Sequence, residues 1–229
     1  MIKNERENVP YVNPKEFSSK HKEVAPDLYY YEKFYKGSGK NAICGVDEAG
    51  RGPLAGPVAI AAVILDENNP IDGLNDSKKL SEKKRELLYD EIINKAVAYN
   101  IVFSDKDEID EINILNATLL GMKRAVEGLS ITPDIAMIDG NKTPEIDGVE
   151  TVAIIKGDAK SASIAAASLL AKVTRDRYMV ELAKKYPQYQ FEKHKGYGTK
   201  LHRELILEYG PCKEHRVTFL KKVLSGGNA

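Results

Sequence analysis

Two neighbouring carboxylates, Asp47 and Glu48, stand at the end of an apolar stretch, in the run GVDEAGRG of residues 45–52. Neighbouring strand residues point to opposite faces, so one of these acids must face inward or along an edge. An inward acid costs several kcal/mol unless it is paired or binds a metal ion. The Gly50-Arg51-Gly52 triplet that follows offers a backbone open to close approach, with one fixed cation. Carboxylates for metal beside amides and a guanidinium for phosphate indicate phosphodiester chemistry.

Two further aspartates, Asp139 and Asp158, also follow short apolar runs. Ligand sites in α/β sheets form at the carboxyl ends of strands, so adjacent strands would bring four carboxylates together. Four close negative charges repel strongly unless a divalent cation balances them. Oxygen ligands favour Mg²⁺ or Mn²⁺, and two such ions, about 3.5–4 Å apart, can activate water and stabilise a leaving oxygen. Each acid alone is more typical of an ordinary turn than of a functional site, and only the combination favours a site.

The elements that would position these acids follow an α/β pattern. Ser81 is a candidate N-cap, and apolar residues recur at helical spacing after it. Order and spacing predict a mixed central β-sheet flanked by helices, with two antiparallel strands first and parallel strands later, and a helical C-terminal part. The expected strands are residues 42–48, 57–65, 96–103, 135–138 and 151–155, and the expected helices are 81–94, 107–127 and 161–185.

The ends of the chain differ from its centre. Residues 1–40 carry prolines and an aromatic cluster, and Gly37-Ser38-Gly39 is typical of a linker. This arm could be a helix or hairpin that docks on the domain, or a partly ordered tail. We expect residues 41–229 to form the catalytic domain, with a basic helical segment from about residue 186.

Composition describes one well-buried domain with an appendage, at 229 residues, 42% hydrophobic and 30% charged. The sequence has no run of 18 or more apolar residues, so we expect no membrane span. The N-terminus has no apolar h-region, so we expect no secretory signal. The two cysteines, Cys44 and Cys212, lie too far apart for a metal-spaced pair, which favours the cytoplasm and a core role for Cys44. We expect a monomer.

Charge is unevenly distributed, although the net charge is zero. Residues 172–222 hold thirteen Lys and Arg against six Asp and Glu, which leaves twenty-one against twenty-eight elsewhere. An acidic part that binds metal and a basic part that binds the phosphate backbone suit a nuclease. Helical surfaces also differ in charge by chance, so the basic segment alone decides little.

Several separate blocks resemble the type 2 ribonuclease H family, ribonuclease HII, over about residues 42–220. The blocks are GVDEAGRG (45–52), NDSKKL (75–80), IDGN (138–141), KGD (156–158), SIAAAS (163–168), AKVTRD (171–176) and HKGYGT (194–199). Their order and spacing make a chance match improbable. The resemblance implies an RNase H-like fold and an endonuclease that cuts the RNA strand of RNA–DNA hybrids.

The resemblance also implies cutting on the 5′ side of single ribonucleotides in duplex DNA, with two Mg²⁺ or Mn²⁺ ions during turnover and 3′-OH and 5′-phosphate products. By this resemblance, the metal-binding catalytic acids are Asp47, Glu48, Asp139 and Asp158. Gly50, Arg51 and Gly52 would contact the ribonucleotide's 2′-OH and adjoining phosphate, and Tyr197 would stack on its sugar. The 2′-OH distinguishes RNA from DNA, and backbone beside glycine can reach it directly.

Further substrate contacts are expected from lysines and a serine outside the acidic blocks. Ser77, Lys78 and Lys79 are expected to meet phosphates, although lysines on a loop are also ordinary solvated surface. Lys172 is expected to do the same, and its helix also needs a polar face. His194, His202 and His215 are too scattered along the chain to predict a metal site, which favours solvent or core roles.

Departures from the family pattern limit the resemblance. Ala159 stands where the family commonly has serine, which removes one hydrogen bond and keeps the neighbouring Asp158. The arm is too short for the N-terminal domain of ribonuclease HIII, and the Gly50–Gly52 triplet favours HII. Three alternatives stay open: HIII-like hydrolysis of longer RNA runs, a non-catalytic hybrid-binding module, which should have lost an acid, and a phosphate-loop protein, which lacks the lysine.

Overall fold

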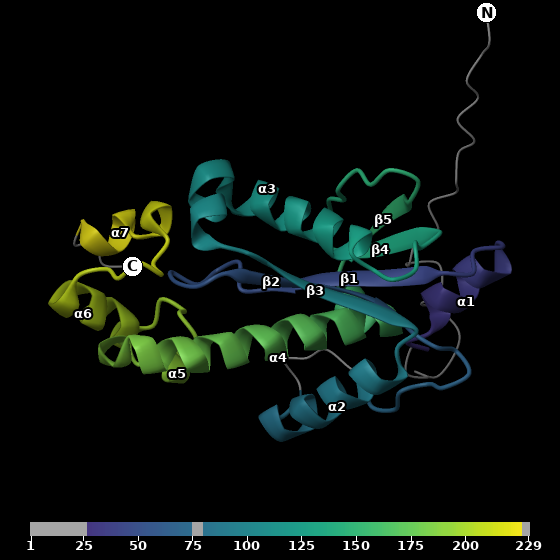
Figure 1. Cartoon of the computed structure of the whole chain (residues 1–229), viewed down its shortest axis with the longest axis horizontal. Coiled ribbons are helices and arrows are strands. Elements are labelled where there is room, and N and C mark those ends of the chain that lie inside the picture. Colours follow the sequence, from purple (N-terminus) through teal and green to yellow (C-terminus); the bar gives the residue numbers. More distant parts are fainter. Residues whose placement is uncertain (1–26, 75–79, 226–229) are drawn as a thin grey trace, which may run out of the picture.

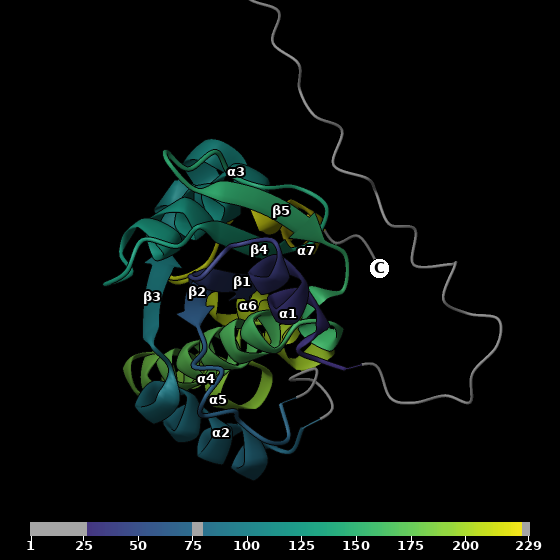
Figure 2. The same ribbon diagram turned by 90° about the vertical axis from the view of Figure 1, so that its right-hand side faces the viewer.

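The structure is a computed structural model that describes residues 27–74 and 80–225. A five-stranded sheet in the order β3-β2-β1-β4-β5 forms the centre of the molecule (Figure 1). Helix α3 covers one face, and helices α4 and α2 cover the other, as the end-on view in Figure 2 shows. The predicted α/β class, with a mixed sheet flanked by helices, is confirmed.

Strand directions follow the predicted pattern. Strands β1 (Ile43–Ala49), β2 (Val58–Ile64) and β3 (Ala98–Ser104) pair in antiparallel fashion, while β4 (Ile135–Asp139) and β5 (Glu150–Ile154) run parallel to β1. Strand β2 is buried along its whole length, as expected for an uninterrupted apolar run covered on both faces. Each predicted strand lies within two residues of its position in the structure.

Helix α3 (Lys106–Glu127) packs its apolar residues on one face of the sheet. Asp105 caps its start by accepting a hydrogen bond from the N–H of Glu108. The helix is kinked at Asn113, where φ is +68°, and the Asn113 side chain accepts hydrogen bonds from the next turn. The periodic pattern predicted the helix and not the kink, because the apolar spacing continues through it.

Helix α4 (Ala162–Lys185) follows β1 along the opposite face. Its small residues permit a very close approach: a Cβ on Gly45 would lie 2.2 Å from the backbone carbon of Ser163. Helix α2 (Glu82–Lys95), capped by Ser81, packs outside α4. The Ala- and Ser-rich first half of α4 therefore packs closely on the sheet.

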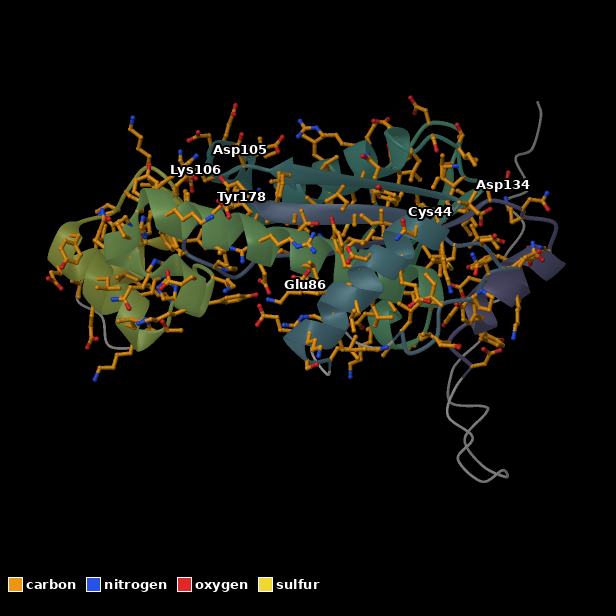
Figure 3. All side chains as sticks on the ribbon, turned by 60° about the horizontal axis from the view of Figure 1, so that its bottom comes forward. Cys44, Glu86, Asp105, Lys106, Asp134 and Tyr178 are labelled. Atoms are coloured by element: carbon orange, nitrogen blue, oxygen red, sulfur yellow. The ribbon has the colours of Figure 1, made fainter. Side chains whose placement is uncertain are left out.

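The C-terminal part is helical, as predicted, and has its own apolar core. It contains η4 (Pro187–Tyr189), α5 (Phe191–His194), α6 (Lys200–Tyr209), η5 (Val217–Phe219) and α7 (Lys221–Leu224). In Figure 3, Tyr178 of α4 lies beside Asp105 and Lys106 at the start of α3, so both helices meet at this end of the sheet.

Helix α1 (Tyr30–Gly37) is the described part of the N-terminal arm. Glu32 Oε1 accepts hydrogen bonds from Ser161 Oγ at 2.6 Å and Ser163 N at 2.9 Å, so α1 caps the start of α4. Tyr31 and Tyr35 pack on the core, whereas Tyr30 and Phe34 are exposed. The helical docked arm is therefore the alternative that the structure favours.

None of the helices described is both long and apolar enough to span a bilayer. Cys44 is fully buried in β1, which confirms its core role (Figure 3).

Candidate active site

Asp47 and Asp139 lie on neighbouring strands and face the same side of the sheet. The parallel register pairs Val46 of β1 with Ile138 of β4, so the two aspartates are the next residues on each strand. Val46 and Ile138 belong to the core under α3, and side chains alternate along a strand. Both carboxylates therefore face α4, on strands that lie about 4.8 Å apart.

The Asp47 side chain is nearly enclosed, at 5% exposure. Its Oδ1 accepts a hydrogen bond from the N–H of Glu48 at 2.7 Å, and Ser168 of α4 also hydrogen-bonds the carboxylate. Burial raises the pKa of Asp47 well above its ordinary value, and the negative charges of Glu48 and Asp139 raise it further. The site therefore concentrates negative charge at a cost to the fold.

Asp158 approaches the same region from the chain segment after β5. It lies in η3 (Gly157–Ala159), whose first residue donates from its backbone N–H to Asp139 Oδ1 at 2.6 Å. Lys156 precedes this turn in the left-handed region, with φ of +57°, and so directs the chain back towards β4. Asp158 is buried, at 9% exposure, at the point where α4 begins.

Glu48 faces away from Asp47 along the strand, yet stays close to the turn that follows. Its Oε1 lies 3.4 Å from Nη1 of Arg51, whose side chain is half exposed. This long contact between groups near the surface contributes little to stability. It does place the one side-chain cation of the Gly50–Gly52 triplet beside the carboxylates.

The acids are not gathered as they would be around a bound ion. Within residues 27–74 and 80–225, no group of three or more His, Cys, Asp or Glu side chains has metal-binding geometry. Like charges repel, and Asp139 and Glu48 instead make the contacts with Gly157 and Arg51 described above. The donors still fit a hard divalent cation, because all are carboxylate oxygens and no cation of the described residues forms a salt bridge with the buried Asp47.

The predicted substrate-contacting turn has an unusual backbone. Gly50 has φ of +103°, and a Cβ there would lie 2.0 Å from Nε of Arg175, so only glycine fits. A Cβ on Gly52 would lie 3.9 Å from the ring of Tyr197, which is 44% exposed. The structure thus brings the Gly50–Gly52 triplet and Tyr197 together, although they are far apart in the sequence.

The remaining predicted residues are less directly placed. Lys172 lies one helical turn beyond Ser168 on α4, and its Nζ contacts Asp176 Oδ1 at 2.8 Å. It is therefore on the face of α4 that contacts Asp47, and it has a carboxylate partner. Ser77, Lys78 and Lys79 lie outside the described residues.

Sequence reasoning did not identify the contacts that three residues make in the site. Ser168 contacts Asp47, and Arg175 and Arg216 hold the turn that contains Gly50. Ser168 and Arg175 lie in the blocks 163–168 and 171–176 that resemble the family. The sequence therefore identified the blocks and not the contacts of these two residues. Arg216 lies in an irregular segment with no periodic signal, and only the folded chain brings it to the turn.

The three histidines that are scattered in the sequence stack beneath the Tyr197 turn. His194 and His202 rings lie 4.2 Å apart, and His202 Nε2 lies 3.1 Å from His215 Nε2. Each is buried, which confirms a core role. His202 Nδ1 also contacts the carbonyl of Tyr197 at 3.0 Å, so the cluster supports this turn from below.

Comparisons with known proteins show what the chain is similar to. A protein-family model described as Ribonuclease HII matches residues 44–222. The protein named Ribonuclease HII of Caldicellulosiruptor bescii is 57% identical over 204 residues, covering 88% of this chain and 98% of the relative. That of Aliivibrio fischeri is 58% identical over 188 residues, covering 81% and 90%. The crystal structure of ribonuclease H2 from Pyrococcus horikoshii OT3 matches with a TM-score of 0.68 at 30% identity, covering 81% and 98%.

Proposed function

The chain belongs to the ribonuclease HII family, and we propose that it is an endonuclease that hydrolyses the RNA strand of RNA–DNA hybrids and cuts 5′ of single ribonucleotides in duplex DNA. One observation carries the proposal. Asp47 and Asp139 lie next to each other on the neighbouring strands β1 and β4, and both face α4. Asp158 lies in η3, just before α4 begins. Glu48 and the Gly50–Gly52 triplet follow at once on the same strand end.

In this proposal the metal-binding carboxylates are those of the four acids Asp47, Glu48, Asp139 and Asp158. They would hold Mg²⁺ or Mn²⁺, with two ions during turnover. When bound, the ions would supply positive charge that favours deprotonation of the attacking water and stabilises the leaving oxygen. Ser168 and the N–H of Gly157 fix the orientation of Asp47 and Asp139, as the hydrogen bonds of these groups indicate.

The reaction is an in-line displacement at phosphorus. The water oxygen bonds to the phosphate on the 5′ side of the ribonucleotide, and the bond from phosphorus to the O3′ of the preceding nucleotide breaks. O3′ takes up a proton and leaves as a 3′-OH, while the phosphate stays on the ribonucleotide as its 5′ end. The buried position of Asp47 supports its proposed role in this displacement, because a carboxylate in a low-dielectric site interacts more strongly with nearby charges than a carboxylate in water.

Recognition of the ribonucleotide falls to the turn and to Tyr197. Gly50, Arg51 and Gly52 present backbone to the 2′-OH and phosphate, and Arg51 adds a cation. Tyr197, with its exposed ring beside Gly52, stacks on the sugar. Lys172 and the segment that contains Ser77, Lys78 and Lys79 contribute phosphate contacts.

The proposal extends to the domain organisation and the compartment of the enzyme. We propose a monomeric, cytoplasmic enzyme, and the absence of a disulfide between its two cysteines supports the reducing compartment. We propose residues 41–229 as the catalytic domain, because the basic residues that suit a nuclease concentrate in its C-terminal part. Residues 1–40 form an arm whose helix α1 supports α4.

The proposal is tested by comparing three labelled duplexes with Mg²⁺ or Mn²⁺ and with EDTA. One carries a single ribonucleotide, one an all-RNA strand, and one is all DNA. The expected result is a metal-dependent cut 5′ of the single ribonucleotide, and no cut in all DNA. Cutting of the all-RNA strand alone would favour HIII-like activity, and tight binding without cutting would favour a hybrid-binding module.

A further inference from the structure

Two arginines are buried beneath the Gly50–Gly52 turn. Arg175 of α4 is 1% exposed, and Arg216, just before η5, is fully enclosed. Burying a guanidinium is unfavourable unless its charge is compensated. In the part of the chain that the structure describes, both groups donate to backbone carbonyls, and neither pairs with a carboxylate. Two such cations at one turn require a physical explanation.

Arg216 closes the turn by binding three of its carbonyl groups. Its Nη2 donates to the carbonyls of Gly50 and Gly56, each at 2.7 Å. Its Nη1 donates to the carbonyl of Arg51 at 2.9 Å, and its Nε to that of Gly56 at 2.9 Å. Because the guanidinium is planar and its donors are fixed, these carbonyls are held in one arrangement.

Arg175 joins the same turn to the segment that carries Tyr197. Its Nε and Nη2 donate to the carbonyls of Pro57 and Ala55 at 2.9 and 3.1 Å, while Nη1 donates to the carbonyl of Lys195 at 2.9 Å. Its guanidinium carbon also lies 5.8 Å from the centre of the Tyr197 ring. The side chain occupies the space that a Cβ on Gly50 would need.

The direction of the carbonyls fixes the direction of the N–H groups. In a trans peptide the C=O and the N–H point to opposite sides. The carbonyls of Gly50 and Arg51 point to Arg216, so the N–H groups of Arg51 and Gly52 point away from it. Within the described residues, no backbone or side-chain acceptor binds these two N–H groups.

The charge of the arginines acts in the same direction. Burial lowers the pKa of Arg175 to about 10 and that of Arg216 to about 9, and the nearby charge of Arg175 contributes to the second shift. Both guanidinium groups therefore stay charged at neutral pH. Two cations below a pair of outward N–H groups create a positive potential that favours an anion or an electron-rich oxygen.

We propose that Arg216 and Arg175 are positioning residues for substrate recognition: they bind the inward carbonyls of the turn and so hold the N–H groups of Arg51 and Gly52 towards the ribonucleotide. The inference rests on the proposed function and deepens it. It assigns the selectivity of the Gly50–Gly52 triplet to two buried side chains that need not touch the substrate.

A purely structural role for these arginines predicts a different result. If they only joined the loops, their replacement would lower stability and would weaken binding of every duplex to the same extent. A positioning role predicts a selective loss, because the ribonucleotide uses the oriented N–H groups more than an all-DNA duplex does. The ratio of the two dissociation constants separates these possibilities.

The experiment measures binding of the full chain to a single-ribonucleotide duplex and to the all-DNA duplex, in EDTA so that no strand is cut. Arg216→Lys and Arg175→Lys keep the charge and remove the multiple fixed donors. We expect each to reduce the ribonucleotide preference by about 10-fold, the size expected for the loss of one hydrogen bond to the substrate. The urea midpoint of each variant reports whether it is folded. Arg124→Lys, at an exposed arginine of α3 paired with Glu108, is the matched control and should keep the full preference.

A folded Arg216→Lys variant with the full preference of the wild-type protein would overturn the arginine proposal and leave the proposed function intact. A wild-type protein that shows no preference and cuts no ribonucleotide would instead refute the proposed function. If the variants fail to fold, the wild-type protein still provides a test. On addition of the ribonucleotide duplex, the amide resonances of Arg51 and Gly52 should shift, and that of exposed Gly148 should not. Unchanged Arg51 and Gly52 amides at saturation would contradict the proposal.

Discussion

Replacing Asp47 by Asn should abolish cleavage and stabilise the metal-free protein. Asp47 is nearly enclosed, and its pKa is raised by burial and by the charges of Glu48 and Asp139. An acid whose pKa is higher in the folded state than in the unfolded state binds its proton more tightly when folded. The fold is therefore penalised as the pH rises above the ordinary pKa of 3.8. Asn removes this penalty.

The size of the gain has an upper limit. If the buried negative charge of Asp47 destabilised the fold too strongly, the carboxylate would bind a proton instead. At pH 7 the penalty therefore cannot exceed the free energy of protonating a carboxylate with the ordinary pKa of 3.8, which is about 4 kcal/mol. Asn is nearly the same size as Asp and keeps the oxygen that accepts from the N–H of Glu48. We therefore expect a stabilisation of about 1–4 kcal/mol, with each kcal/mol raising the melting temperature by about 2–4 °C.

The assay is urea unfolding of both proteins at pH 7, first in EDTA and then with millimolar Mg²⁺. Asp47→Asn should be the more stable protein in EDTA, and Mg²⁺ should stabilise the wild-type protein by more than it stabilises the variant. Glu86→Gln, at an exposed acid of α2 paired with Arg177, is the control and should respond to Mg²⁺ as the wild-type protein does. A variant that is less stable than the wild-type protein in EDTA would refute the reasoning about repulsion.

Three further predictions follow from buried or half-buried groups. Burial lowers the pKa of His202 and His215 from 6.5 to about 4. Because the unfolded chain then binds these protons more tightly than the folded protein does, the free energy of unfolding is highest above pH 6.5 and falls as the pH drops towards 4. Urea unfolding across this range should show a loss on the order of 3 kcal/mol for each imidazole. Gly50→Ala forces a Cβ into the Arg175 side chain at positive φ, so thermal unfolding should show a loss of roughly 3 kcal/mol or a failure to fold, and an unchanged midpoint would contradict the packing. Glu32→Ala removes the cap on α4 and should lower unfolding free energy by about 1–2 kcal/mol while kcat is kept; a large loss of kcat in the folded variant would place α1 closer to the chemistry than proposed.

Much of the fold could be predicted from local patterns. Apolar runs that end in turns gave the strands, and Ser81 marked the start of α2 because a side-chain oxygen there can bind a free N–H of the first turn. These signals are local, so one sequence is enough to detect them. Periodicity could not predict the kink at Asn113, since a single residue with positive φ leaves the apolar spacing on both sides unchanged.

The candidate site was predictable only in part. Its acids lie at strand ends, and the resemblance to a known family singled out Asp47, Glu48, Asp139 and Asp158. The structure describes the neighbourhood of Asp47 and Asp139, whereas the catalytic roles of all four acids stay predictions. The supporting contacts could not be predicted, because Arg216 and Gly50 are brought together only by the folded chain. The three histidines are likewise far apart in sequence and stacked in space.

The most direct test of the central claim is cleavage of a DNA duplex that contains one ribonucleotide, by the wild-type protein and by Asp47→Asn, with Mn²⁺ or Mg²⁺. Both proteins should bind the duplex. The account predicts that only the wild-type protein cuts, that the cut lies 5′ of the ribonucleotide, and that the products end in 3′-OH and 5′-phosphate. Full turnover by Asp47→Asn, or a cut in the all-DNA duplex at the same rate, would contradict it.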